Sequence, residues 1–345
     1  MKRVVLWSVP CLLVLVCLLP AAAAATDERA PVEIVDQTGH AIRVDRPVEH
    51  LVSVYGAGTY YAYTLGVADR LAMAWYIGVK GLSNASEAMF RLEPRLEKIL
   101  AFGDPNVEEM IAREADLILV DGSRHGAFAE QMNDLGVPTL QFLVETPEAL
   151  KEAVRLLAGA FGDVERARAE AFADDYDRVT AGITADLAGI ADDERARVLF
   201  LGTDPLTVAS GDMYQARLIE AAGGTLVSGG LSGYWNEVNL EQILLWNPDV
   251  ILIPPYGPVQ PDDLLDSEDW LAIRAVQDGR VHRLPRVIAP IDTPVPESLL
   301  GIAWMAEALY PDRVTFDLAA ETARFYAAYY GYALSDDELR HLTGR

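Results

Sequence analysis

Aromatic and cationic side chains cluster just after the predicted strands of this 345-residue sequence. In a doubly wound sheet, the carboxyl ends of the strands are where ligands bind. Aromatic rings there can grip a large, flat or globular molecule, and a guanidinium group can bind a carboxylate. For each ring taken alone, core packing is the competing interpretation, and for each arginine a surface ion pair. We predict nine ligand-binding residues: Tyr55, Trp75, Tyr76, Phe102, Arg124, Tyr234, Trp235, Tyr256 and Arg286.

The sequence lacks the motifs of common enzyme classes. It has no phosphate-binding loop, no Gly-x-Ser-x-Gly elbow and no His-x-x-x-His pair, and the run Gly56-Ala-Gly58 lacks the third glycine of a dinucleotide fingerprint. We therefore predict no catalytic residue, no cofactor and no metal site. One alternative is a chelatase-like enzyme using His125 with Asp121. Another is a binder of bare metal ions, although the sequence does not assemble the cluster of histidines and carboxylates that it would need.

The first 25 residues are predicted to be a signal peptide. Lys2 and Arg3 precede a largely apolar run over residues 4–19, and an Ala-x-Ala site at residues 23–25 predicts cleavage before Thr26. An uncleaved membrane anchor is less favoured, because the run is shorter than the ~20 residues of a spanning helix. We therefore expect an exported, periplasmic protein.

Both cysteines, Cys11 and Cys17, lie inside this leader, so the mature chain has no thiol and no disulfide. A lipid anchor on Cys17 is the less favoured alternative, because the residues before it are not the small ones that such a site requires. The formal net charge is −24. Such a chain repels nucleic acid and anionic lipids, which excludes both as partners.

One stretch occurs twice in the sequence. Residues 106–120 and 239–253 share Asn, Glu, Asp, Ile and Leu at the same places, and each copy reads as a short helix, a turn and a buried strand. Asn106 and Asn239 are predicted N-caps, while Glu108 and Glu241 fall in the first helical turn, where a carboxylate suits the helix dipole. The repeat predicts two similar α/β lobes. Chance similarity between two helix-turn-strand units is the alternative.

The order of predicted strands and helices divides the chain into three parts. They are an N-terminal α/β lobe over residues 26–146, a connecting helix over 147–190 and a C-terminal α/β lobe over 191–345. The connecting segment fits one long helix or two in tandem, because Gly159 and Gly162 interrupt its apolar stripe. A helical hairpin packed on one lobe is the other interpretation. Helices over 297–309 and 315–330 are expected to complete the second lobe, with frayed final residues.

Several stretches of the sequence, in their order along the chain, resemble the periplasmic substrate-binding proteins of ABC importers for ferric siderophores, haem and cobalamin. The resemblance is carried by residues 32–39, 47–54, 221–224, 296–304 and 309–311 together with both repeat copies, and it spans essentially the whole mature chain. It implies an α/β fold of two Rossmann-like lobes joined by a long rigid helix, with the ligand in the cleft and little hinge motion.

The resemblance also implies a function. A monomeric protein would capture a metal chelate, with an iron–siderophore first and haem or cobalamin next, and would deliver it to an ABC importer permease with its ATPase. Glu108 and Glu241 match the glutamates that dock onto permease arginines in that family. Phe102 and Trp235 match aromatics that line the cleft of its cobalamin binder, with Phe102 standing where that protein has tryptophan. Tyr55 is the residue that could ligate haem iron.

Overall fold

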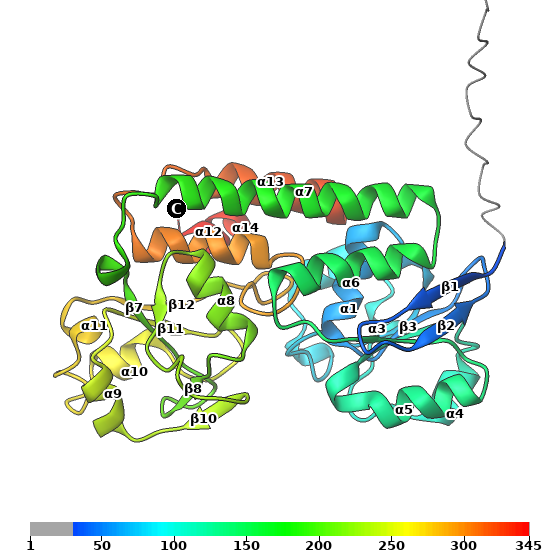
Figure 1. Cartoon of the computed structure of the whole chain (residues 1–345), viewed down its shortest axis with the longest axis horizontal. Helices are drawn as coiled ribbons and strands as arrows, with labels where there is room; N and C mark the ends of the chain where they lie inside the picture. Colours follow the sequence, from blue (N-terminus) through cyan, green and yellow to red (C-terminus); the bar gives the residue numbers. More distant parts are fainter. Residues whose placement is uncertain (1–29, 345) are drawn as a thin grey trace, which may run out of the picture.

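The computed structural model describes residues 30–344 and shows two α/β lobes side by side, bridged by one long helix (Figure 1). The predicted signal peptide over residues 1–25 lies outside the described residues. Within residues 30–344, no helix is both long and apolar enough to cross a membrane. The predicted α/β class is confirmed by two separate parallel sheets, one in each lobe.

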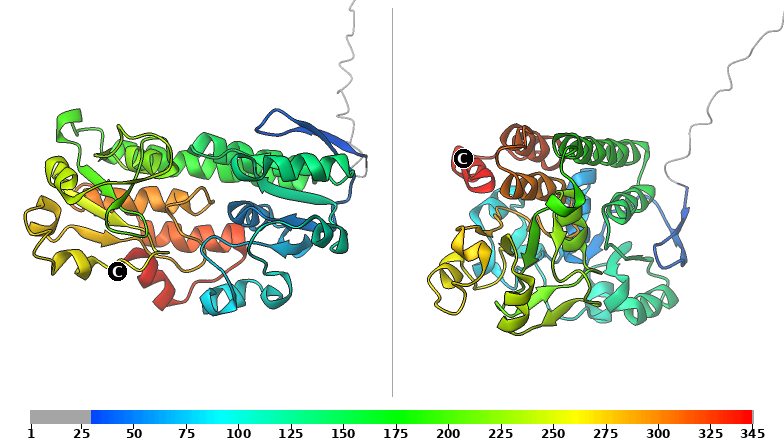
Figure 2. Two further views of the ribbon diagram at one scale, coloured as in Figure 1. Left: turned by 90° about the horizontal axis from the view of Figure 1, so that it is seen from below. Right: turned by 60° about the vertical axis from the view of Figure 1, so that its left-hand side comes forward.

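The N-terminal lobe is built on four parallel strands in the order β4-β3-β5-β6. Their bounds are β3 Leu51–Ser53, β4 Leu71–Ala74, β5 Leu117–Asp121 and β6 Thr139–Phe142. The helices of this lobe are α1 Gly56–Leu65, α2 Glu87–Leu92, α3 Leu96–Ile99, α4 Val107–Ala112 and α5 Gly122–Asp134. A hairpin of β1 Val32–Val35 and β2 Ala41–Val44 lies on its outer side, far from the other lobe (Figures 1 and 2). Short 3-10 turns cover Ala68–Arg70 and Leu82–Asn84.

The C-terminal lobe follows the same plan, with parallel strands in the order β12-β11-β7-β9. Their bounds are β7 Arg197–Phe200, β9 Thr225–Leu226, β11 Val250–Ile253 and β12 Val281–Arg283. The lobe also contains α8 Tyr214–Ala221, α9 Leu240–Trp246, α10 Pro261–Leu265 and α11 Arg274–Gln277. A separate antiparallel ribbon pairs β8 Thr207–Ala209 with β10 Trp235–Glu237, so that Trp235 lies opposite Ala209.

The sequence repeat has a structural basis in both lobes. The side chain of Asn106 caps α4 by accepting from the backbone N–H groups of Glu108 and Glu109, and the side chain of Asn239 caps α9 by accepting from Gln242. Both predicted N-caps are therefore confirmed.

The repeated aspartate has a role that the sequence did not suggest. Asp116 accepts from the backbone N–H groups of Glu49 and His50 at 2.8 Å, and Asp249 accepts from that of Arg197 at 3.0 Å. In each lobe the aspartate thus ties the repeated strand to the start of its central neighbour.

The segment predicted as a connecting helix over 147–190 contains two helices, α6 Pro147–Gly159 and α7 Asp163–Asp186, followed by a 3-10 turn at Asp192–Glu194. The chain reverses between them, so α6 packs on α7 and on α1 of the first lobe. The 24 residues of α7 span about 36 Å at 1.5 Å per residue. Helix α7 packs against α1 of one lobe and α8 of the other, so it bridges them. Of the two arrangements that the sequence left open, the segment forms two helices rather than one.

The C-terminal tail joins the two lobes rather than completing only the second. Its helices are α12 Ser298–Leu309, α13 Leu318–Tyr330 and α14 Asp336–Thr343. Helix α13 packs against both α1 and α12, and the ring of Tyr330 lies 5.5 Å from that of Tyr63. The residues expected to fray instead form α14, which Ser335 caps.

Candidate ligand-binding site

A cavity of about 720 Å³ lies between the two lobes. The first lobe contributes the segments that follow β3, β4, β5 and β6, and the second contributes the start of α8, the ribbon strand β10 and the loop before α12. The cavity is thus at the carboxyl ends of the parallel strands in the first lobe, where a doubly wound sheet binds ligands.

Seven of the nine predicted ligand-binding residues line this cavity: Tyr55, Trp75, Tyr76, Arg124, Tyr234, Trp235 and Tyr256. Local packing holds several of the rings in place. Tyr55 stacks on Phe142 with ring centroids 6.1 Å apart, and Trp235 lies 6.4 Å from Phe200. Tyr234 remains half exposed at the rim. The rings come from both lobes, so a molecule in the cavity would meet aromatic surface on two sides.

Phe102 and Arg286 do not line the cavity. Phe102 lies in the loop before α4 and is 59% exposed, whereas Trp235 is held on the β8–β10 ribbon, which has no counterpart in the described part of the first lobe. The guanidinium of Arg286 donates to the carbonyl oxygen of Ile77 at 2.9 Å, and Arg286 lines a different hollow. Arg286 therefore joins the lobes to each other.

Four charged side chains face the cavity: Lys80, Arg124, Asp121 and Glu145. Arg124 lies 3.5 Å from the carboxylate of Asp121. Glu145 accepts two hydrogen bonds from the opposite lobe, from the backbone N–H of Tyr214 and the hydroxyl of Tyr234, each at 3.1 Å. Burial raises the pKa of Glu145 above its ordinary value, and those two donors oppose the shift. The two cations are thus matched by two carboxylates.

His125 lines the same cavity at a break in α5, where its backbone is non-helical with φ −119° and ψ 22°. Its ring packs edge-on against Trp75 at 6.0 Å, and its buried Nδ1 has no hydrogen-bond partner. Burial lowers the pKa of His125, so the imidazole is neutral at pH 7. No group of three histidine, cysteine or carboxylate side chains within residues 30–344 could hold a metal ion.

Several cavity residues were not predicted from the sequence: Lys80, Glu145, Tyr214, Gln215, Thr293 and Pro294. Glu145 follows β6 as Tyr55 follows β3, so a stricter use of the strand-end rule would have found it. Thr293 and Pro294 come from the loop before α12 and carry no such signal, because their place in the cavity depends on how the two lobes meet.

The two glutamates of the repeat are exposed in the first turns of α4 and α9. Neither Glu108 nor Glu241 makes an ion pair or side-chain hydrogen bond within the described chain, whereas the adjacent Glu109 pairs with Arg113 at 3.4 Å. Helices α4 and α9 lie on the same side of the molecule, one in each lobe, opposite α7 (Figure 1). The structure therefore leaves both carboxylates without a partner in the described chain, each at the start of a helix in a different lobe.

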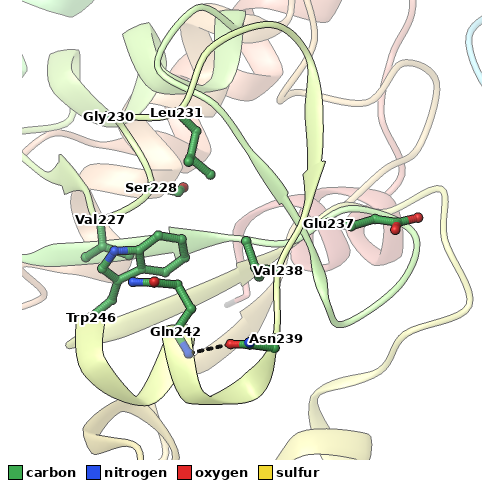
Figure 3. Close-up of a pocket in the computed structure, with 9 residues that line it drawn as sticks. All are labelled: Val227, Ser228, Gly230, Leu231, Glu237, Val238, Asn239, Gln242 and Trp246. Carbon is green, nitrogen blue, oxygen red and sulfur yellow. Dashed lines mark hydrogen bonds between the residues drawn. The ribbon is translucent and has the colours of Figure 1, made fainter.

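A second hollow, of about 590 Å³, lies on the C-terminal lobe outside the interlobe cavity. Figure 3 shows it between the loop over 227–231 and helix α9, with Leu231 on one side and Trp246 on the other. It receives no residue from the first lobe. It is therefore separate from the aromatic cavity.

The fold and the cavity between its lobes define a bilobal solute-binding protein. Residues 51–287 match the family model of the periplasmic binding proteins, and the chain belongs to that family. It is therefore a solute-binding protein of the ABC transporter type and not an enzyme.

Individual relatives differ in what their names say they bind. The chain is 28% identical over 302 residues to the molybdate-binding protein MolA of Haemophilus influenzae, covering 79% of this chain and 85% of that protein. It is 26% identical over 269 residues to the vitamin B12-binding protein of Yersinia pestis, covering 72% and 90%. A periplasmic solute-binding protein from Veillonella parvula has the same fold, with a TM-score of 0.79 at 23% identity over 91% of this chain and 97% of that one.

Proposed function

We propose that this protein is exported to the periplasm, captures a metal chelate between its lobes and delivers it to the permease of an ABC importer. A ferric siderophore is the first candidate ligand, and haem or cobalamin the next. The observation that carries the proposal is the aromatic cavity of about 720 Å³ shared by both lobes.

The size and lining of the cavity favour a ligand of this kind. Pockets of roughly 300–1,000 Å³ accommodate molecules of drug size and bury most of their surface. Tyr55 and Trp75 from one lobe and Trp235 and Tyr256 from the other offer apolar faces, which suit the organic periphery of a chelate.

The free carboxylates of Glu108 and Glu241 support delivery to a permease. Each is exposed and without a partner in the described chain, and each sits at the start of a helix on the same side of the molecule. Two separated carboxylates can pair with two arginines on a partner, which fixes orientation as well as contact.

An oxyanion such as molybdate is the second candidate, because the relative at 28% identity is named as a molybdate binder. Lys80 and Arg124 could contribute positive charge to such a ligand. Two features favour a chelate instead. The cavity is large for a single oxyanion, and Asp121 and Glu145 place negative charge in its lining.

The test is a fluorescence titration of the mature, ligand-stripped protein with ferric siderophores, haemin, cobalamins and molybdate. Trp75 and Trp235 line the cavity, so a bound chelate should quench their emission in a saturable way. A Trp246→Phe control, altered in the separate hollow, should keep this response. A response to molybdate alone would favour the oxyanion, and no response to any probe would reject the chelate.

Trp235→Ala supplies a second arm of this test. Removing a ring that faces the cavity should weaken chelate binding by roughly tenfold or more, as for other aromatic contacts at the centre of a binding site. The dissociation constant should be measured beside that of the Trp246→Phe control. An unchanged constant would remove Trp235 from the site.

A further inference from the structure

Glu145, in the first lobe, accepts a hydrogen bond at 3.1 Å from the rim residue Tyr234 of the second lobe. It follows β6, and one of its carboxylate oxygens accepts from the Tyr234 hydroxyl while the other accepts from the backbone N–H of Tyr214. Tyr214 is the first residue of α8, whose N-cap residue, Met213, provides no side-chain cap. Glu145 therefore supplies the anion at the N-terminus of a helix that belongs to the opposite lobe.

The same carboxylate lines the ligand cavity, where it changes the balance of charge. Arg124 is the cation that acts on Glu145, but it also lies 3.5 Å from Asp121, so one guanidinium is shared by two carboxylates. The donors to Glu145 are an N–H and an O–H, both suited to an ionised acceptor. An anionic ligand would meet this fixed negative charge, and like charges placed side by side in a partly buried site repel strongly.

We propose that Glu145 is a specificity-determining residue, which selects among ferric siderophores by disfavouring those of net negative charge and admitting neutral or cationic ones. This inference rests on the proposed function. It divides iron chelates by chemistry, because a ferric tris-catecholate carries a net negative charge, whereas a ferric tris-hydroxamate is neutral or positive. The charge of the cavity lining therefore favours the ferric tris-hydroxamates.

The test compares two probes, a ferric tris-catecholate and a ferric tris-hydroxamate, by fluorescence titration of the wild-type protein and of Glu145→Gln. The amide keeps the size of the side chain and an acceptor oxygen but removes the charge. We expect affinity for the catecholate to rise by roughly tenfold or more, and affinity for the hydroxamate to change by less than about threefold. Glu148→Gln is the matched control, because Glu148 is 78% exposed on α6 and lies outside the cavity, so it should change neither affinity.

A measurement on the wild-type protein provides an independent check. If charge repulsion sets the preference, the ratio of the two affinities should narrow as salt is raised from about 0.05 M to about 0.5 M, because screening shortens the reach of exposed and half-exposed charges. A ratio that does not depend on salt would contradict the proposal.

Other outcomes distinguish this inference from the proposed function. An equal change in both affinities for Glu145→Gln would mean that Glu145 only holds α8 in place, and would overturn the inference while leaving chelate binding intact. A wild-type protein that binds the catecholate more tightly than the hydroxamate would overturn it as well. Binding of neither probe, nor of haemin or cobalamin, would overturn the proposed function and the inference together.

Discussion

At the scale of single residues, the junction between the lobes contains carboxylates that are fully buried. Glu297 accepts from the Tyr330 hydroxyl at 2.6 Å, and its other oxygen has no partner. Asp292 accepts from Tyr256 at 2.9 Å. Burial raises the pKa of Glu297 to about 7 and that of Asp292 to about 6, while the charge of Arg286 opposes both shifts. The arginine that sequence reasoning assigned to the ligand instead lies near these acids.

The raised pKa of Glu297 predicts how the free energy of unfolding varies with pH. Between about pH 4.5 and pH 7 the Glu297 carboxyl binds more protons in the folded protein than in the unfolded chain, so the free energy of unfolding falls as pH rises. Above about pH 7, Glu297 causes no further change in stability. The full effect is about 3 kcal/mol, because the pKa of Glu297 rises from 4.5 in the unfolded chain to about 7 in the folded protein. Glu297→Gln should therefore stabilise the protein at pH 8 more than at pH 5.

Urea unfolding of both proteins at the two pH values measures this difference. Glu297→Gln keeps an acceptor for Tyr330, so the comparison isolates the charge. A change in the free energy of unfolding that is equal at pH 5 and pH 8 would show that the carboxylate is not the source of the pH dependence.

At the scale of elements, the two repeated helices are short and depend on their caps. Helix α4 has six residues and α9 has seven, and lengths of this kind are not stable alone in water. Asn106 and Asn239 satisfy backbone donors that would otherwise lack partners. The same two caps fix the first turns that carry Glu108 and Glu241, so local stability and the presentation of the carboxylates are linked.

We expect Asn106→Ala and Asn239→Ala each to lower the free energy of unfolding by about 1 kcal/mol, the usual contribution of an N-cap side chain. Serine at either position should restore most of it, because its hydroxyl also accepts from the backbone. Denaturant unfolding of the four single variants would measure these effects. Equal losses for alanine and serine would contradict the capping role.

At the scale of the whole molecule, several contacts hold the lobes at a fixed distance. Arg168 on α7 donates to the carbonyl oxygens of Thr64 on α1 and of Ala328 and Tyr329 on α13. The hydroxyl of Tyr61 donates to the carbonyl of Pro294 at 2.9 Å, across the lobes. Together with the continuous helix α7, these contacts oppose the large closing motion that a flexible hinge of a few loop residues would permit.

Ligand binding is therefore expected to change the distance between the lobes by less than about 2 Å. Spin labels on cysteines introduced at the exposed positions Glu130 and Glu268 would report this distance. The protein should be produced from Thr26 onward, because both native cysteines lie within the first 25 residues and no other thiol then remains. A larger change on adding a saturating chelate would show that α7 does not act as a rigid bridge.

The docking prediction also belongs to the whole molecule, because it needs one carboxylate from each lobe. Replacing both Glu108 and Glu241 with lysine should abolish uptake of the chelate, since each contact with a cationic permease surface would become a repulsion. Affinity for the chelate in solution should remain that of the wild-type protein, as neither residue lines the cavity. Loss of that affinity would count against a docking role.

The sequence by itself determined the features that depend on neighbouring residues. The asparagine caps and the apolar strands of the repeat are local, because each needs only a few consecutive residues, and they were predicted at the right positions. The strand-end rule likewise placed Tyr55 and Trp75 correctly at the cavity, since the end of a parallel strand fixes the edge on which the next residue lies.

Only the tertiary structure decided which side chains meet across the lobes. Arg286 and Phe102 have the right residue types, but the first is directed to the Ile77 carbonyl and the second lies in an open loop without a supporting ribbon. The hydrogen bond that ties Glu145 to the second lobe comes from a helix that begins 69 residues later. Contacts over such separations depend on how the helices α6 and α7 and the terminal helices pack, and a sequence pattern read along the chain does not contain that geometry.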